Sequence, residues 1–332
     1  MTRATAIRLF CMLLTFAARH AMTQAQASES AHCVGLDQKF REEVANGRTT
    51  QAETLLADSL APVASRAQHS CAGLILSRTA VQMAVSGRMD EAEEFAEQSV
   101  HVLGENFSPD DVVFFRPFHI LASARFERGE VRKARQAFKR MKTIRIERPE
   151  ERAMLSGFSA TLLTAEGRYR EAESEYLLAV HAWEQAGRGD MADTGTVLNA
   201  LGSLYIREHR LDDARRVLDL AFGIFTSAKD TVPLDLFKLL EVRAAMHVKL
   251  QEWREAEQDL REAVAMTDRL PGLDTGMLGR ALADYAYVLR KNHRRREARS
   301  IEARAAVLHR QAITNMVIDT TELQAHAKSA TK

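Results

Sequence analysis

Several residue types that build β-sheets, disulfide frameworks and turn-rich folds are scarce in this sequence. Its 332 residues include only 3 Cys, 6 Pro and 16 Gly, and aromatic residues make up 6%. Ala, Leu, Glu and Arg dominate instead and favour helices, whereas the aromatic residues that favour strands are few. A large β domain and a doubly wound α/β domain are therefore disfavoured, and we expect an all-α protein.

Neither sign of charge is in excess. The 46 Lys and Arg residues nearly balance the 45 Asp and Glu residues, which gives a net charge of +1. Such a chain has no global field to attract nucleic acid or an anionic membrane, so we expect neither as a partner. With 46% apolar and 27% charged residues, the composition is typical of a soluble folded protein.

Motifs of enzyme chemistry are also lacking. The sequence contains no phosphate-binding loop, no G-x-G-x-x-G, no H-E-x-x-H and no C-x-x-C. Residues 156–160 (SGFSA) half resemble a nucleophile elbow, but they lie in an expected helix rather than after a strand. Histidines such as His119 have no second potential ligand at helical spacing. We therefore predict no enzymatic activity, no cofactor and no metal site.

The first residues have the pattern of a secretory signal peptide. Residues 1–8 carry two arginines and no acid, residues 9–18 form an apolar run, and an Ala-x-Ala site ends at Ala27. That run is about half of what spans a bilayer, so no stable membrane insertion is expected. We predict that residues 1–27 are cleaved off and that the protein is exported, to the periplasm or the exterior. The alternative is a cytoplasmic protein with an uncleaved N-terminus.

An internal repeat runs through the rest of the chain. A turn and the start of a helix recur in phrases that each close on an alanine, as in SGRMDEA (86–92) and EGRYREA (166–172). The closing alanines are Ala52, Ala92, Ala134, Ala172, Ala214, Ala256 and Ala298, separated by 40, 42, 38, 42, 42 and 42 residues. Composition does not explain so narrow a range of spacings, which indicates stacked repeat units.

Each phrase separates two amphipathic helices. Before Ala214, apolar residues between 197 and 205 recur at three- and four-residue steps, and residues 217–225 do the same after it. Gly202 interrupts the first pattern at a cost of about 1 kcal/mol, which we interpret as a place where another helix approaches closely. The equivalent residue, twelve before each alanine, is also small elsewhere except at Phe40: Ala80, Ala122, Ala160, Ala244 and Ala286.

These features resemble the tetratricopeptide repeat over about residues 33–313. Leu201-Gly202, Tyr205 and Ala214 match the motif, whereas Leu198 and Leu218 replace its Trp and Phe. The period of about 42 residues exceeds the common 34 and, with Asn199 before Leu-Gly, is similar to the kinesin-light-chain type. The resemblance implies an all-α, right-handed superhelical solenoid of about seven antiparallel helix pairs. We assign residues 28–313 to this repeat domain and residues 314–332 to a C-terminal cap or flexible tail.

The resemblance also implies a non-enzymatic scaffold that binds a protein or peptide in its concave groove. Projecting the first helix of each pair inward gives the candidate groove residues Arg78, Arg116, His119, Asn199, Ser203, Lys238, Glu241, Asp284, Tyr287 and Arg290. Two alternatives stay open. One is a cytoplasmic peptide-sensing regulator on the same fold, and the other is an enzyme, or enzyme accessory, whose site no motif reveals. The partner and the oligomeric state are not predicted.

Two cysteines remain after the predicted cleavage. In the repeat alignment, Cys33 and Cys71 both lie just before the first helix of adjacent repeats, at the same edge, where loop residues could come within disulfide range. An oxidising compartment would favour this bond. The alternative is two small buried thiols.

The sharpest charge feature is the basic run between Arg290 and Arg299. It could be a docking patch for an acidic partner or nucleic acid, or simply a solvated turn and helix. No aromatic residue interleaves with the run as a stacking platform would require, which favours the solvated surface.

Overall fold

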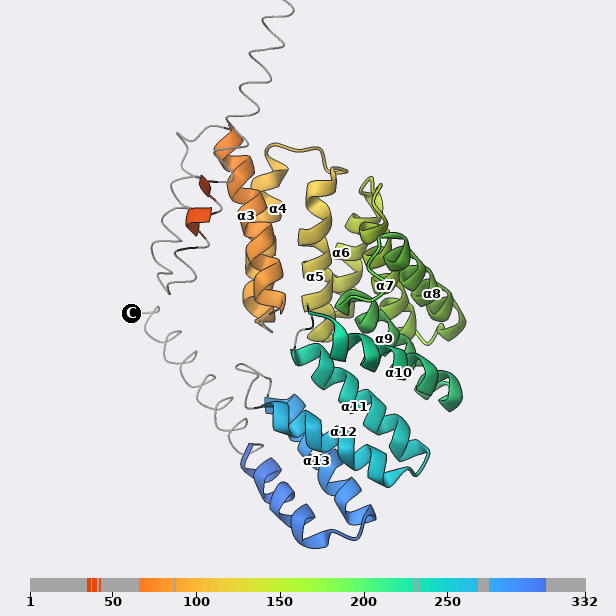
Figure 1. Cartoon of the computed structure of the whole chain (residues 1–332). Helices are drawn as coiled ribbons and strands as arrows, with labels where there is room; N and C mark the ends of the chain where they lie inside the picture. Colours follow the sequence, from red (N-terminus) through yellow and green to blue (C-terminus); the bar gives the residue numbers. More distant parts are fainter. Residues whose placement is uncertain are drawn as a thin grey trace, which may run out of the picture. The chain divides into compact units, whose positions relative to one another are not determined.

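The computed structural model describes residues 35–36, 38–40, 42, 66–85, 88–229, 231, 233–267 and 275–308. Within these ranges all regular structure is helical (Figure 1). None of the described helices is both long and apolar enough to cross a membrane. The predicted signal peptide, the tail at 314–332, Cys33 and Ala52 all lie outside the described residues.

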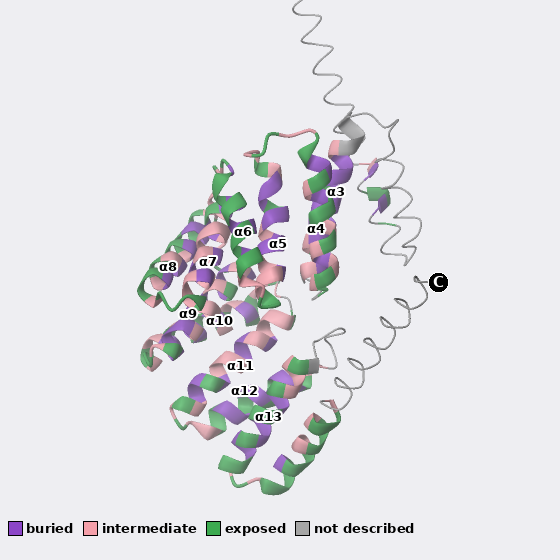
Figure 2. Ribbon diagram, turned by 180° about the vertical axis from the view of Figure 1, so that it is seen from behind, coloured by how far each residue is buried: buried purple, intermediate pink, exposed green. Residues whose placement is uncertain are grey.

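The helices follow one another as pairs joined by short turns, in two compact units. The first unit holds α3 (Arg66–Val85), α4 (Met89–Gly104), the 3-10 turn η1 (Val112–Phe114), α5 (Phe115–Glu127) and α6 (Val131–Thr143). The second holds α7 (Pro149–Ala165), α8 (Tyr169–Gln185), α9 (Ala192–Arg207), α10 (Leu211–Ser227), α11 (Pro233–Lys249), α12 (Trp253–Met266), α13 (Thr275–Lys291) and a last helix over 295–308. Figure 2 shows buried residues on the faces where helices of a unit meet and exposed residues on the opposite faces.

The repeat predicted from the closing alanines is confirmed at every described position. Each alanine lies in the first turns of a second helix and is fully buried, with 0% exposure at Ala92, Ala134, Ala172, Ala214, Ala256 and Ala298. The small residues twelve positions earlier, on the first helices, are at most 1% exposed at Ala80, Ala122, Ala160, Ala244 and Ala286. The two helices of a pair therefore meet where their side chains are smallest, which brings the backbones close together.

The turns inside the pairs share the same backbone conformation. The residue five before the closing alanine has a positive φ in five turns: Gly129 (76°), Gly167 (77°), His209 (60°), Gln251 (60°) and His293 (63°). In each case the next amide N–H donates to the carbonyl five residues back, as in Arg210 N to Tyr205 O at 2.9 Å. This is the Schellman ending, in which a left-handed residue closes the helix. The later turns adopt it without glycine.

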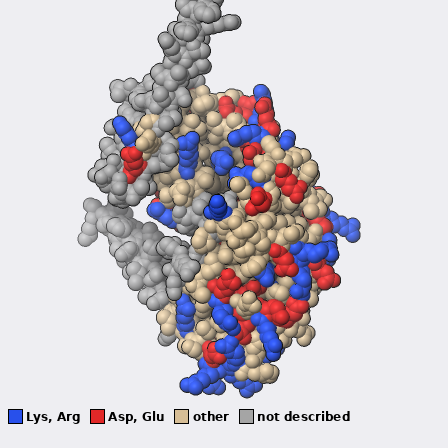
Figure 3. Space-filling model, in the orientation of Figure 1, with Lys and Arg blue, Asp and Glu red and all other residues tan. Residues whose placement is uncertain are grey.

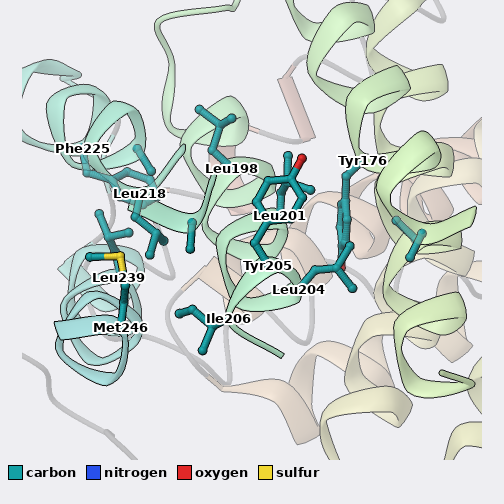
Figure 4. Packing of buried hydrophobic residues seen from close by; sticks show 14 of the residues in the cluster. Tyr176, Leu198, Leu201, Leu204, Tyr205, Ile206, Leu218, Phe225, Leu239 and Met246 are labelled. Atoms are coloured by element: carbon teal, nitrogen blue, oxygen red, sulfur yellow. The ribbon is translucent and has the colours of Figure 1, made fainter. Parts of the chain in front are cut away.

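The interpretation of Gly202 as a point of close approach is confirmed. Leu218 of α10 lies against it, and a Cβ at Gly202 would be 2.4 Å from Leu218 Cδ2. Leu201, Leu204 and Leu218 have 0% exposure and form the centre of the largest described core cluster of the second unit (Figure 4). Leu218 has little room to move away in such a core.

Ion pairs tie consecutive repeats of the second unit together. The residue after one closing alanine pairs with the residue four before the next: Glu173 with Arg210 at 2.9 Å, and Arg215 with Glu252 at 2.6 Å. Glu257 and Arg294 form the third such pair. The charges are reversed in the middle pair, so the same geometry is used with both polarities.

The placement of Cys71 departs from the sequence prediction. It lies inside α3, in the second turn, rather than before the first helix, because that helix begins earlier, at Arg66. Its side chain is 3% exposed among Leu36, Phe40 and Ile75, and it is disulfide-bonded. Its predicted partner Cys33 lies outside the described residues, so the Cys33–Cys71 pairing stays a prediction.

We predict opposite effects of one substitution at two helical glycines of the same repeat. Gly202→Ala should lower the free energy of unfolding by about 1 kcal/mol, because overpacking against Leu218 outweighs the gain in helix propensity. Gly223→Ala, in α10, should raise it by about 0.5–1 kcal/mol, since Gly223 is exposed and nothing lies within 4 Å of an added Cβ. Urea unfolding monitored by circular dichroism measures both. Equal effects at the two sites would contradict the close-approach interpretation.

Candidate functional site

Three of the candidate groove residues lie in the first unit. Arg78 on α3 and Arg116 on α5 are exposed, whereas His119 on α5 is partly buried. Burial, followed by repulsion from the Arg116 guanidinium, lowers the pKa of His119 to about 4. His119 is therefore neutral at pH 7 and offers hydrogen bonding rather than charge.

The other seven candidates lie on first helices of the second unit. Asn199 and Ser203 are on α9, Lys238 and Glu241 on α11, and Asp284, Tyr287 and Arg290 on α13. Asn199, Ser203, Lys238 and Glu241 are partly buried, whereas the three α13 residues are exposed. The residues of α9 pack on one face of α11 and those of α12 and α13 on another, so α11 is central to the site.

The charged candidates of α11 and α13 form one electrostatic cluster. Glu241 interacts with Arg280, with Asp284 and with Lys238, which draws the α11 and α13 side chains into a common site. Sequence reasoning missed Arg280. Its spacing of four residues from Asp284 on an expected helix was the available signal.

Glu241 is the most perturbed carboxyl of this cluster. Burial raises its pKa to about 7, the Asp284 carboxylate adds to the rise, and Arg280 and Lys238 oppose it only in part. Partial desolvation of the Asp284 carboxyl also raises its pKa, against the lowering effect of Arg280. Two carboxyls are thus held on this face without full compensation by the basic side chains that surround them.

Asn199 presents an unsatisfied acceptor. Its Oδ1 atom is buried and has no hydrogen-bond partner among the described residues. A buried amide oxygen without a partner costs about 1–3 kcal/mol relative to a satisfied one. Ser203 lies one turn further along the same face of α9.

Tyr287 and Arg290 are engaged elsewhere. Tyr287 packs edge-to-face on Trp253 of α12, with ring centroids 6.2 Å apart, and Lys291 Nζ lies 5.4 Å from both rings. Arg290 forms an ion pair with Glu302 of the last helix. The basic run therefore does have aromatic neighbours, which sequence reasoning missed because Trp253 belongs to the preceding repeat. Since Lys291 covers both rings, they are not free faces on which a base could stack.

Charges of both signs are interspersed over the face shown in Figure 3. The basic run contributes to this balance, because Arg290 pairs with Glu302 and Arg294 pairs with Glu257 and Glu297. No group of three or more His, Cys, Asp and Glu side chains that could hold a metal ion occurs among the described residues.

No protein-family model matches this sequence, and no curated protein matches it either. Solved structures do match. BtubC (BKLC) from P. vanneervenii has a TM-score of 0.51 and 19% identity, over 72% of this chain and 92% of BtubC. The apo quorum sensor NprR from B. thuringiensis has a TM-score of 0.51 and 11% identity, over 83% of this chain and 87% of NprR.

A third match has the same degree of similarity. The apo form of RapI has a TM-score of 0.51 and 11% identity, over 83% of this chain and 76% of RapI. Identities this low carry the fold and not the ligand. The all-α class and the tetratricopeptide-like repeat expected from the sequence are both confirmed: the fold is that of a tetratricopeptide-like helical solenoid.

Proposed function

We propose that this protein is an exported, non-enzymatic scaffold that captures a protein or peptide segment on the first helices of its second unit. The binding face is formed by Asn199 and Ser203 on α9, by Lys238 and Glu241 on α11, and by Asp284 on α13. First helices are the elements that line the ligand face of helical-repeat proteins.

The observation that carries this proposal is the unsatisfied polar chemistry of that face. The buried Asn199 Oδ1 lacks a donor, and Glu241 is desolvated enough that its pKa rises to about 7. Polar groups that serve only folding are normally satisfied within the chain. Groups that are buried and unsatisfied fit a surface whose partner supplies the missing donors.

The chemistry of the face favours an extended peptide segment. The Asn199 amide can accept from a peptide N–H and donate to a peptide carbonyl. Lys238 and Arg280 beside Glu241 and Asp284 offer both signs of charge to the ligand's side chains or termini. The likeness of the fold to the quorum sensor NprR favours ligand sensing as the use of such a face.

Export is supported by the pattern of residues 1–27 and by the disulfide at Cys71. Disulfides persist in oxidising compartments and are rare in the cytosol. The second candidate is a cytoplasmic regulator that senses a peptide with the same face, which the likeness to NprR favours.

Capture of peptides should depend on the α9–α11 face. We expect Asn199→Ala combined with Lys238→Glu to lower the affinity of selected peptides at least about tenfold, because a backbone partner is lost and a charge is reversed. The peptides come from selection of a phage-displayed random dodecamer library on the wild-type protein, and affinity is measured by fluorescence anisotropy.

A matched control keeps this test specific. Gln258→Ala with Lys229→Glu makes similar changes at exposed positions away from the face and should leave affinity within about twofold. Both double variants should retain wild-type helicity. If the two variants bind the selected peptides equally well, the face assigned here is wrong.

Glu241 should reduce the stability of the ligand-free protein at neutral and alkaline pH. Its folded pKa of about 7 exceeds its ordinary value of 4.5, so the folded state holds the proton more tightly and stability falls as pH rises between these values. Glu241→Gln should therefore raise the free energy of unfolding by about 1 kcal/mol at pH 8 and by almost nothing at pH 4. The full pKa rise would represent roughly 3 kcal/mol, which partial hydration reduces.

Urea unfolding of both proteins at pH 4 and pH 8 measures this difference. Glu262→Gln, at an exposed carboxyl of α12, serves as the control and should have no comparable effect. A Glu241→Gln variant that is less stable than wild type at pH 8 would mean that the carboxylate stabilises the ligand-free fold, contrary to the proposal.

Export and the disulfide are tested together by intact mass. Protein purified from its native host should lack residues 1–27, and alkylation under denaturing conditions without reductant should not add to its mass. Reduction before alkylation should then add two alkyl groups, at Cys33 and Cys71. A full-length chain with three alkylated thiols and no reductant would reject export and favour the cytoplasmic regulator.

A further inference from the structure

The repeat made of α11 and α12 carries polar residues at three positions where its neighbours are apolar or aromatic. In this repeat they are Arg243, His247 and Asp259. The equivalent residues of the preceding repeat, 42 positions earlier, are Leu201, Tyr205 and Val217, and those of the following repeat, 42 positions later, are Tyr285, Leu289 and Ile301. All these equivalents belong to the apolar cores of the second unit, where Figure 4 shows Leu201 and Tyr205. The α11–α12 repeat therefore places polar groups where its neighbours pack apolar side chains.

These three side chains are largely shielded from solvent. The side chains of His247 and Asp259 are 6% and 7% exposed, and that of Arg243 is 14% exposed. A charge buried in this way costs stability unless an opposite charge and hydrogen bonds compensate it. Positions that break the apolar pattern of a core are also those at which a role beyond folding is expected. The pairing of Arg243 is therefore the feature to explain.

Arg243 lies between two carboxylates and is hydrogen-bonded to neither of them. Its Nε atom is 3.7 Å from Asp259 Oδ2 on α12, in its own repeat, and 3.9 Å from Asp219 Oδ1 on α10, in the preceding repeat. Both distances exceed that of a hydrogen bond. Arg243 Nε and Nη1 and Asp259 Oδ2 are buried without a hydrogen-bond partner among the described residues. The guanidinium is thus shared between two acids at similar distances.

The surrounding groups keep the guanidinium near both acids without fixing it on one of them. Arg243 Cζ lies 4.1 Å from the centroid of the Phe222 ring of α10, which offers a flat surface to the guanidinium. His247 Nε2 is 3.8 Å from Asp259 Oδ2, but its Nδ1 is 2.7 Å from Glu252. Burial raises the pKa of Asp259, and Arg243 and His247 oppose this rise only in part. A hydrogen bond from Arg243 would therefore still stabilise the Asp259 carboxylate.

We infer that Arg243 is a two-position latch between successive repeats, which bonds to Asp219 in one arrangement and to Asp259 in the other. The bond to Asp219 joins α11 to the preceding repeat, and the bond to Asp259 joins α11 to α12 of its own repeat. Either bond is a charge-assisted hydrogen bond that the guanidinium lacks at its intermediate position.

The latch gives the junction between α10 and α11 two arrangements of similar free energy. Arg243 has nearly the same distance to cover to either acid, and the planar guanidinium has several N–H donors with which to bond. Small movements of this kind are how packed helices change their relative position. This inference concerns the junction between two repeats and does not depend on the ligand face proposed above.

The two acids should substitute for each other in stabilising the fold. The test compares the urea midpoints of the full-length wild type, Asp219→Ala, Asp259→Val and the double variant, followed by circular dichroism. Each single variant leaves Arg243 one acid, whereas the double variant leaves it buried without either. We therefore expect the double variant to lower the midpoint by at least about 0.5 M more than the sum of the two single changes.

Two controls make this test specific to Arg243. In an Arg243→Leu background, which introduces the residue type found at Leu201, the same two changes should add to within about 0.2 M, because no buried cation depends on the acids. Asp212→Ala and Glu255→Ala remove exposed acids of α10 and α12 and should also add within about 0.2 M in the presence of Arg243.

The nuclear magnetic resonance signal of the Arg243 Nε–H group reports which acid it contacts, and its absence from Arg243→Leu identifies it. Asp259→Val should hold the guanidinium on Asp219, and Asp219→Ala should hold it on Asp259, so the two variants give two reference positions. We expect the wild-type signal to lie between these positions or to be divided between them, because Arg243 moves from one acid to the other.

Three results would overturn the inference. The first is a wild-type signal that coincides with that of one variant alone, which would mean that Arg243 stays with a single acid. The second is additivity of the two acid substitutions in the presence of Arg243. The third is non-additivity that persists in the Arg243→Leu background, which would mean that the acids act through another residue.

Discussion

The close approach of two helices at a pair of small residues is the constraint on which the rest of this structure depends. Each described closing alanine is fully buried, the alanines twelve positions before five of them are at most 1% exposed, and a Cβ at Gly202 would be 2.4 Å from Leu218 Cδ2. Backbones that meet this closely fix the relative position of the two helices within narrow limits. The turns then have little freedom, which is consistent with five of them sharing one left-handed position, three without glycine.

Neighbouring repeats are aligned by charge as well as by packing. The ion pair between one alanine phrase and the next recurs in the second unit as Glu–Arg, then Arg–Glu, then Glu–Arg. Each exposed pair contributes only about 0.2–1 kcal/mol. The alternating polarity of the pairs matters more for the order in which the repeats stack. If a repeat packed against the repeat after its normal neighbour, like charges would meet. Repeats with similar cores need such a device, since packing alone does not distinguish one neighbour from another.

The repeat was predictable from sequence because its determinants are local and periodic. Seven alanines at a nearly fixed spacing, and Gly202 where the helix pattern favours a larger residue, are visible without coordinates. The site was less predictable, because its character depends on contacts between repeats. Trp253 meets Tyr287, and Arg280 reaches Glu241, only after the helices stack. The burial of Asn199 Oδ1 leaves no trace in the chain itself. Cys71 was misplaced because its helix starts a turn earlier than the repeat alignment predicted.

Buried polar groups of the described residues differ in how far the chain itself satisfies them. His247 is 5% exposed, yet its Nδ1 lies 2.7 Å from Glu252, which in turn pairs with Arg215, so this buried group is compensated within the chain. Asn199 Oδ1 lacks such compensation, because it is buried and no described residue donates a hydrogen bond to it. Polar groups that stay uncompensated cost stability. Under the proposed function, a partner that donates a hydrogen bond to Asn199 Oδ1 would remove this cost.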